Sequence, residues 1–194
     1  MPKIYLIHGW DGSPDEPMHA WLKQKLTDKG FEVVVPKMPG AETPHIEPWL
    51  AKMKEVVGVP DEQTYFIGHS IGCQAVLRYL TTLPEQTKVA GVFLIAPWMF
   101  LDDEAIAEDG EEASAIQKEW ESAPLDWNKL KNKTKNFICQ FSDNDPFVLL
   151  EKNKELFAEK INAEILIDNE KGHFTEDDGV TENQRVVDWF VKLK

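Results

Sequence analysis

The sequence has few of the features that mark secreted, membrane-spanning or metal-clustering proteins. It contains only 2 cysteines in 194 residues, too few for a disulfide framework, and Cys73 and Cys139 lack the spacing of a metal-binding pair. We expect both to be small buried hydrophobic side chains. No segment approaches the roughly 18 apolar residues of a membrane span, and the opening "MPKIYLIHGW" resembles a strand rather than a signal peptide. These absences predict a cytoplasmic protein.

Positive charge is also scarce. The chain has 21 Lys and Arg against 34 Asp and Glu, which gives a formal net charge of −13 and an isoelectric point of about 4.8. Such a chain repels phosphate groups, so we expect neither nucleic acid nor membrane partners. The 42% hydrophobic and 28% charged residues are typical of a globular protein. The length predicts a single domain over residues 1–194.

Short apolar runs alternate with amphipathic segments along the chain. Six runs are predicted to be strands: residues 3–7, 32–36, 64–68, 89–96, 136–141 and 163–168. Most are apolar at nearly every position, as expected of strands covered by helices on both faces. The sequence therefore predicts an α/β protein of three layers, with a mostly parallel, six-stranded, doubly wound sheet between helices.

Two of the intervening helices carry start signals. Apolar residues recur at helical spacing over residues 46–57, with Thr43 as the predicted N-cap and Pro44 at the first helical position. Near the C-terminus, Thr181 and Gln184 have the spacing of a capping box, which predicts that the last helix begins there.

The segment 98–127 is longer than an ordinary connection. Its first half contains seven acidic residues and no Lys or Arg: Asp102, Asp103, Glu104, Glu108, Asp109, Glu111 and Glu112. A charge run of this kind is typical of a solvated face or a mobile loop. The alternative is a small lid, or loop insertion, whose aromatic residues Trp98, Phe100 and Trp120 cover a pocket. The two interpretations are compatible.

A serine lies between two glycines where the strand 64–68 gives way to an amphipathic helix. In Gly68-His69-Ser70-Ile71-Gly72, the glycines remove Cβ atoms that would clash at a sharp strand-to-helix turn. This turn is the G-x-S-x-G nucleophile elbow of α/β-hydrolases, and it would expose the hydroxyl of Ser70. The alternative is a glycine-rich turn with an incidental serine.

A serine hydroxyl needs a general base, and the base needs an orienting acid. In α/β-hydrolases the chain order is serine, acid, histidine, and His173 is the only histidine after Ser70. His173 follows the last predicted strand in a loop, as expected of a mobile base. For His8 and His69, which precede or adjoin the serine, we expect packing or hydrogen-bonding roles.

The acid is expected in the loop after the strand 136–141. That loop offers Asp143 and Asp145. We favour Asp145, because Pro146 makes the loop rigid at that point and is suited to open the next helix. Asp143 is then a turn-forming residue.

The oxyanion that forms on the substrate carbonyl requires hydrogen-bond donors. One predicted donor is the backbone N–H of Ile71, and the other is the backbone N–H of Trp10 in the loop after the first strand. Gly9 allows close approach there. The bulk of Trp10 predicts a crowded apolar pocket, lined further by Trp98 and Phe100.

Five segments together carry a family resemblance: "HGWDGS", "IGHSIG", "QFSDNDPFV", "KGHF" and "LDWNKLK". The first four, in this order along the chain, resemble the small α/β-hydrolases of the retinoblastoma-binding protein 9 family, and the fifth, at residues 125–131, is also similar to that family. The resemblance implies an α/β-hydrolase fold with a minimal lid, a catalytic triad on Ser70, Asp145 and His173, and neither a metal nor an organic cofactor. The L-x-C-x-E motif for pocket proteins is absent around both cysteines, so retinoblastoma-type binding is not expected.

These patterns predict a cofactor-free serine hydrolase that cleaves small carboxylic esters through an acyl-enzyme. Two alternatives remain open. One is an amidase or peptidase that acts on small aminoacyl substrates, because the same triad serves both reactions. The other is a non-catalytic protein-binding module on the same fold.

Overall fold

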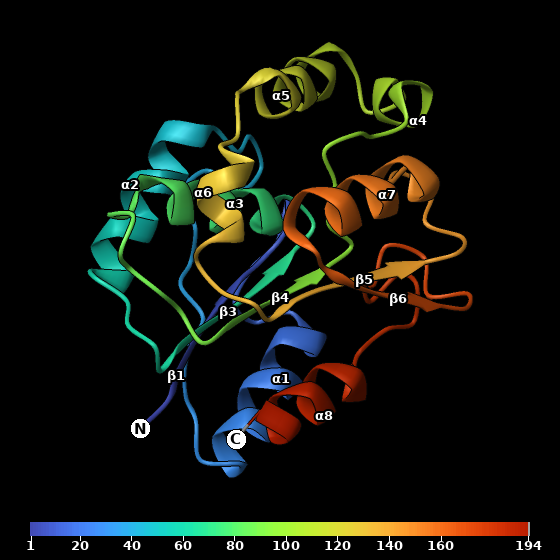
Figure 1. Ribbon diagram of the computed structural model, residues 1–194. Coiled ribbons are helices and arrows are strands. Elements are labelled where there is room, and N and C mark those ends of the chain that lie inside the picture. Colours follow the sequence, from blue (N-terminus) through green and yellow to red (C-terminus); the bar gives the residue numbers. More distant parts are fainter. Residues whose placement is uncertain (194) are drawn as a thin grey trace.

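The computed structural model describes residues 1–193, in which six strands alternate with eight helices (Figure 1). The strands are β1 (Lys3–Ile7), β2 (Glu32–Val34), β3 (Thr64–His69), β4 (Gly91–Ile95), β5 (Phe137–Ser142) and β6 (Glu164–Asp168). The helices are α1 (Pro17–Asp28), α2 (Ile46–Val57), α3 (Ile71–Thr82), α4 (Asp103–Ala107), α5 (Glu111–Ser122), α6 (Trp127–Lys131), α7 (Leu150–Ile161) and α8 (Gln184–Leu193).

The strands form one sheet in the order β2-β1-β3-β4-β5-β6, and all five neighbouring pairs are parallel. The predicted six-stranded sheet is confirmed. The chain leaves β1 toward β2 on one side and returns to β3 on the other, so the direction of winding switches between β1 and β3. Ligands of open α/β sheets bind in the crevice at the carboxyl ends of the strands at such a switch point. The loop after β1 and the turn after β3 meet there.

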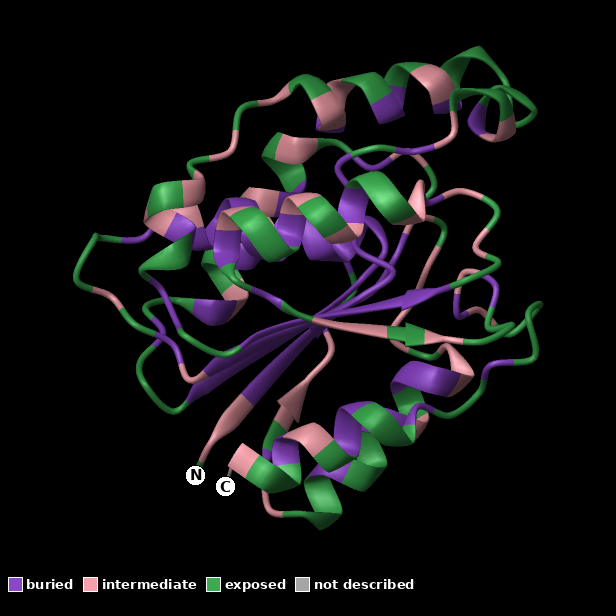
Figure 2. Cartoon of the chain, turned by 45° about the vertical axis from the view of Figure 1, so that its right-hand side comes forward, coloured by how far each residue is buried: buried purple, intermediate pink, exposed green. Residues whose placement is uncertain are grey.

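Helices cover both faces of the sheet. In Figure 1, α1 and α8 lie together on one face, and α2, α3, α6 and α7 lie on the other. All residues of β3, β4 and β5 are buried, whereas the edge strands β2 and β6 are partly exposed (Figure 2). Predominantly apolar sequences therefore occupy the strands that are covered on both sides.

The predicted start of helix α2 is wrong by two residues. The helix begins at Ile46, not at Pro44, and His45 occupies the N-cap position. Glu119 of α5 accepts a hydrogen bond from the Ile46 N–H at 2.9 Å, and its second carboxylate oxygen lies 2.6 Å from Nδ1 of His45. Glu119, which is more than 70 residues away, thus accepts the hydrogen bond at the helix N-terminus that the local sequence predicts for Thr43.

The predicted capping box at the last helix is also wrong. Helix α8 begins at Gln184, so this residue is the first helical position rather than the third. The preceding Asn183 is buried, and its side-chain amide donates to Oε1 of Gln140 in β5 at 2.8 Å. This contact keeps Asn183 outside the helix, which begins at the next residue. Thr181 lies exposed before the helix and does not occupy its N-cap position.

The acidic segment forms α4 and α5, which lie outside the helical layer that contains α3 (Figure 1). The buried Arg78 of α3 fixes the end of α5, because its guanidinium donates to the backbone oxygens of Trp120, Ala123 and Pro124. Burial lowers the pKa of Arg78 to about 10. Trp120 is fully buried and donates to the Pro44 carbonyl at 2.8 Å, so it anchors the segment rather than facing a pocket.

Both cysteines are free and buried, as predicted. Within residues 1–193, none of the helices has the length and apolar character needed to cross a bilayer.

Candidate active site

Ser70 occupies the sharp turn between β3 and α3. Its backbone has φ 53° and ψ −124°, a left-handed conformation that non-glycine residues rarely adopt. A Cβ on Gly68 would lie 2.7 Å from the backbone of Cys73, and one on Gly72 would lie 2.3 Å from the Ile7 carbonyl oxygen. The two glycines therefore let α3 approach both β3 and β1 closely. This geometry is that of a nucleophile elbow.

Three side chains that are distant in the sequence form one hydrogen-bonded chain. Oγ of Ser70 lies 2.8 Å from Nε2 of His173, and Nδ1 of His173 lies 2.8 Å from Oδ2 of Asp145. Side-chain exposure is 13% for His173 and 3% for Asp145. Because the carboxylate can only accept, Nδ1 carries the proton and Nε2 is left to accept from the serine hydroxyl.

The loop after β5 presents Asp145 rigidly. Its Oδ1 accepts from the backbone N–H groups of Phe147 and Val148 at 2.9 and 3.1 Å, which leaves Oδ2 for His173. Helix α7 begins only at Leu150, so the prediction that Pro146 opens it is wrong. The bonds of Asp145 to its own loop hold the residues between Pro146 and the helix in a separate turn.

The same loop also holds the backbone of the segment that carries His173. Asp143 accepts from the Glu170 N–H at 2.8 Å, and Asn144 accepts from the Gly172 N–H at 2.8 Å. On the other side of His173, the Asp178 carboxylate accepts from the His173 N–H at 2.8 Å. Sequence reasoning missed these contacts. Asp143 therefore binds the loop that carries His173 in addition to lying in its own turn. Hydrogen bonds thus fix the backbone of that loop both before His173 and at His173 itself.

The predicted oxyanion donors flank Ser70. A Cβ built on Gly9 would lie 3.3 Å from Cβ of Ser70, so the backbone after β1 passes directly beside the serine. Trp10 lines the pocket, and its indole donates to the Glu42 carbonyl at 2.9 Å. Ile71 is the first residue of α3, and the first N–H groups of a helix have no acceptor within it.

His8 and His69 make hydrogen bonds within the fold, as expected. Nε2 of His8 accepts from the Met38 N–H at 3.0 Å, and its Nδ1 lies 2.9 Å from the Gly9 carbonyl. Nε2 of His69 lies 2.9 Å from the backbone oxygen of His173. Burial lowers the pKa of His8 and, more strongly, the pKa of His69. His69 thus adds a further contact to the loop of the base.

A pocket of about 600 Å³ opens at Ser70 and His173. Trp10 and Trp98 line it, but Phe100 does not and is 42% exposed. The prediction of Phe100 as a pocket residue is wrong, because both of its backbone groups pair with the side chain of Asn153 in α7 and its own side chain lies at the exposed surface. Leu101, which bridges to Val148, contributes to the wall instead.

The pocket is not simply apolar. Seven of its lining residues are acidic, and none of the lining residues is Lys or Arg: the acidic ones are Asp11, Glu16, Glu42, Asp109, Glu112, Glu176 and Asp177. Burial raises the pKa of Asp11, and the negative charges of Glu42 and Asp109 raise it further. Two of these carboxylates come from the acidic segment 98–127, which therefore contributes to the pocket wall.

Comparison with known proteins places this arrangement in a family. Residues 4–191 match the family model described as serine hydrolase. This chain belongs to the serine hydrolase family. The resemblance that the sequence motifs indicate is thereby confirmed.

Two relatives of this serine hydrolase are similar over most of their length. YdeN of Bacillus subtilis (strain 168) is 28% identical over 181 residues, covering 92% of this chain and 89% of the relative. Its crystal structure superposes with a TM-score of 0.89 at 26% identity, over 100% of this chain and 98% of that one. The serine hydrolase RBBP9 of Rattus norvegicus is 28% identical over 168 residues, 86% of this chain and 78% of the relative.

A more distant structure shares the fold alone. Est1E from Butyrivibrio proteoclasticus, with ferulic acid bound, superposes with a TM-score of 0.70 at 18% identity and covers 100% of this chain and 89% of that one. The serine hydrolase described here therefore has the α/β-hydrolase fold.

Proposed function

We propose that this serine hydrolase cleaves small carboxylic esters through an acyl-enzyme, with Ser70, His173 and Asp145 as its catalytic triad. The supporting observation is the unbroken chain of 2.8 Å contacts from Oγ of Ser70 through both ring nitrogens of His173 to Asp145. A hydrogen-bonded series of this kind removes the proton from the serine hydroxyl as its oxygen attacks the substrate.

In the first half of the proposed reaction, Oγ of Ser70 attacks the ester carbonyl carbon while Nε2 of His173 takes its proton. Asp145 stabilises the resulting imidazolium, and the backbone N–H groups of Trp10 and Ile71 bind the oxyanion. Collapse of the tetrahedral intermediate breaks the bond to the alcohol, which leaves with the proton from His173. Water then attacks the acyl-enzyme by the same route and releases the acid.

The test is labelling and turnover with matched variants. Wild-type protein should react with a fluorophosphonate probe and hydrolyse p-nitrophenyl acetate, and Ser70→Ala should do neither. Ser122→Ala is the control, because Ser122 is exposed at the end of α5. Undiminished labelling of Ser70→Ala would contradict the assignment of the nucleophile. A wild-type protein that no serine probe labels would instead favour a non-catalytic binding module.

A second candidate, hydrolysis of small aminoacyl esters or amides, is favoured by the charge of the pocket. Seven carboxylates without a single Lys or Arg create a negative potential around the serine, which would attract a substrate with a free amine. Asp109 and Glu112 lie on the segment that lines one wall.

The two candidates differ in their response to substrate charge. We expect alanine p-nitrophenyl ester to have a higher kcat/KM than its N-acetylated form, and Glu112→Gln to reduce this ratio. The preference should weaken as salt is added, because exposed charges are screened. Equal kcat/KM values for the two esters would rule out recognition of the amine and leave the simple esterase.

A further inference from the structure

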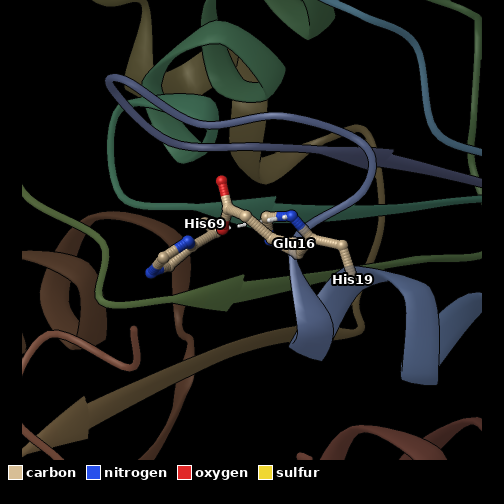
Figure 3. A group of neighbouring side chains, drawn as sticks. All are labelled: Glu16, His19 and His69. Carbon is tan, nitrogen blue, oxygen red and sulfur yellow. Dashed lines mark ion pairs between the residues drawn. The ribbon is translucent and has the colours of Figure 1, made fainter. Parts of the chain in front are cut away.

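A second group of chemically active side chains lies behind Ser70. It consists of Glu16, which immediately precedes α1, His19 in the first turn of α1, and His69 at the end of β3. One potential ligand atom from each lies within 4.8 Å of the other two. In the view of Figure 3, the carboxylate of Glu16 lies between the two imidazole rings. Three residues from two elements thus converge next to the catalytic pocket, which Glu16 and His69 also line.

The outer contacts of both imidazoles fix which nitrogen carries hydrogen. Nε2 of His69 lies 2.9 Å from the backbone oxygen of His173, and Nδ1 of His19 lies 3.2 Å from the backbone oxygen of Ser13. A carbonyl oxygen can only accept, so each of these nitrogens must donate. In the neutral rings, Nδ1 of His69 and Nε2 of His19 then carry free lone pairs.

Neither of those two lone pairs has a protein partner. Nδ1 of His69 and Nε2 of His19 are both buried and make no hydrogen bond within the described residues. Side-chain exposure of His19 is 0%, and His69 as a whole is 3% exposed. Buried polar atoms without a partner are rare and require an explanation. The two rings lie edge to face with their centroids 5.5 Å apart, and Oε2 of Glu16 lies 3.4 Å from Nδ1 of His19.

We propose that Glu16, His19 and His69 bind one divalent transition-metal ion of the Zn²⁺ class. Two imidazoles and a carboxylate are ligands that Zn²⁺ and Co²⁺ accept readily, whereas Mg²⁺ and Ca²⁺ prefer oxygen ligands. Metal-binding histidines usually donate their other ring N–H to a backbone carbonyl or carboxylate, as both do here. The ion supplies the partner that both lone pairs lack.

The site must contract when the ion binds. Zn²⁺ bonds of about 2.0–2.2 Å place tetrahedral ligands roughly 3.4 Å apart, whereas the present ligand atoms are spread over up to 4.8 Å. Glu16 is the group best able to move, because its side chain is 29% exposed and it lies in a loop rather than within a strand. The helix and strand that carry the histidines need to shift less.

The ion would have a positioning role and take no part in the ester chemistry. Glu16 lies in the segment that links Trp10 to α1, and His69 contacts the backbone of His173. A bound ion would fasten the oxyanion loop to the end of β3, adjacent to Ser70. Binding should therefore stabilise the folded protein by mass action, independently of whether the proposed ester reaction is correct.

Equilibrium dialysis of chelator-treated protein against Zn²⁺, and a titration with Co²⁺ followed by its d–d absorption, test the site. Wild-type protein should bind one equivalent, Co²⁺ should give the spectrum of a nitrogen-containing site, and Zn²⁺ should raise the Tm. His19→Ala and Glu16→Gln should each weaken binding by at least about tenfold. Glu16→Gln guards against misfolding, because glutamine keeps an acceptor for the Ser13 N–H that Glu16 now binds at 2.8 Å.

His45→Ala is the matched control. His45 is exposed and pairs with Glu119, another histidine–carboxylate contact, but lies outside the group. This variant should bind Zn²⁺ as tightly as wild type. Absence of binding by the wild-type protein at micromolar Zn²⁺ would overturn the proposal, and the two nitrogens would then share a buried water. Equal binding by wild type and both site variants, or equal competition by Mg²⁺, would also overturn it, because the ion would then sit on the acidic surface.

Discussion

Replacement of Gly72 by alanine tests whether the approach of α3 to β1 sets the geometry of the site. The added Cβ would lie 2.3 Å from the Ile7 oxygen and 2.5 Å from the His8 oxygen, whereas ordinary contacts begin at 3.4 Å. The helix must therefore move away from β1 by 3.4 − 2.3, or about 1.1 Å. Both obstacles are backbone atoms, so no side chain can rotate to make room.

This movement separates the two proposed oxyanion donors. Ile71 lies on α3, whereas Trp10 follows β1, so a gap of this size lengthens at least one of their hydrogen bonds to the oxyanion. A misplacement of about 1 Å at a reacting centre costs roughly 10²-fold in rate. Overpacking should also cost about 1–3 kcal/mol of stability. We expect kcat for p-nitrophenyl acetate to fall by about 10²-fold, while the protein remains folded.

The assay is steady-state hydrolysis normalised to the folded fraction, with urea unfolding measured in parallel. Gly58→Ala is the control, because Gly58 has φ 66° and no atom within 4 Å of the added Cβ. That variant should lose about 1–2 kcal/mol through backbone strain and keep its turnover. If Gly72→Ala kept the wild-type kcat, the close contact between helix and strand would not be what aligns the donors.

Three further predictions concern stability and reactivity. Burial lowers the pKa of His8 below its usual 6.5, and its Nε2 accepts a hydrogen bond from the Met38 N–H. As the pH falls below 6.5, only the unfolded state gains this proton, so stability should fall by up to about 1.4 kcal/mol per pH unit. Urea unfolding at pH 7 and pH 5 should show a smaller loss in His8→Gln, and an equal loss would contradict the reasoning. The buried Asn153 pairs with backbone groups of Met99 and Phe100, at the start of the segment 98–127, and of Leu149, just before α7. Asn153→Leu should therefore cost about 2–4 kcal/mol in urea unfolding, and an unchanged stability would show that those groups find other partners. Burial raises the pKa of the Cys73 and Cys139 thiols, so Ellman's reagent should modify neither before unfolding; rapid reaction in native buffer would contradict their burial.

The sheet and the order of its site-bearing loops could be predicted because they depend on local patterns. Buried strands reveal themselves as short runs of apolar residues, and a G-x-S-x-G turn has a backbone requirement that glycine alone meets. His173 could be identified by chain order, since it is the only histidine after Ser70. Asp145 could be favoured over Asp143 through its position before Pro146, and it is Asp145 that lies 2.8 Å from His173.

What the sequence could not predict depends on partners that are distant in the chain. The start of α2 is set by Glu119 of α5, and the start of α8 follows a contact between Asn183 and Gln140. The side on which Phe100 lies is determined by an isolated bridge between Leu101 and Val148. Periodicity carries no information about such pairings, because each joins residues whose separation in sequence has no fixed value.

The loop after β5 explains why one short sequence segment has so large an effect on the site. Asp145 binds the imidazole of His173, while Asp143 and Asn144 bind the backbone just before it. Consecutive residues thus fix both the side chain and the main chain of the proposed base. A base held in this way needs no large motion to reach Ser70, and its 2.8 Å contact with Oγ is already formed without substrate. Hydrogen bonds between the two loops therefore preorganise the site, whereas helices α4 and α5 contribute to the wall of the pocket.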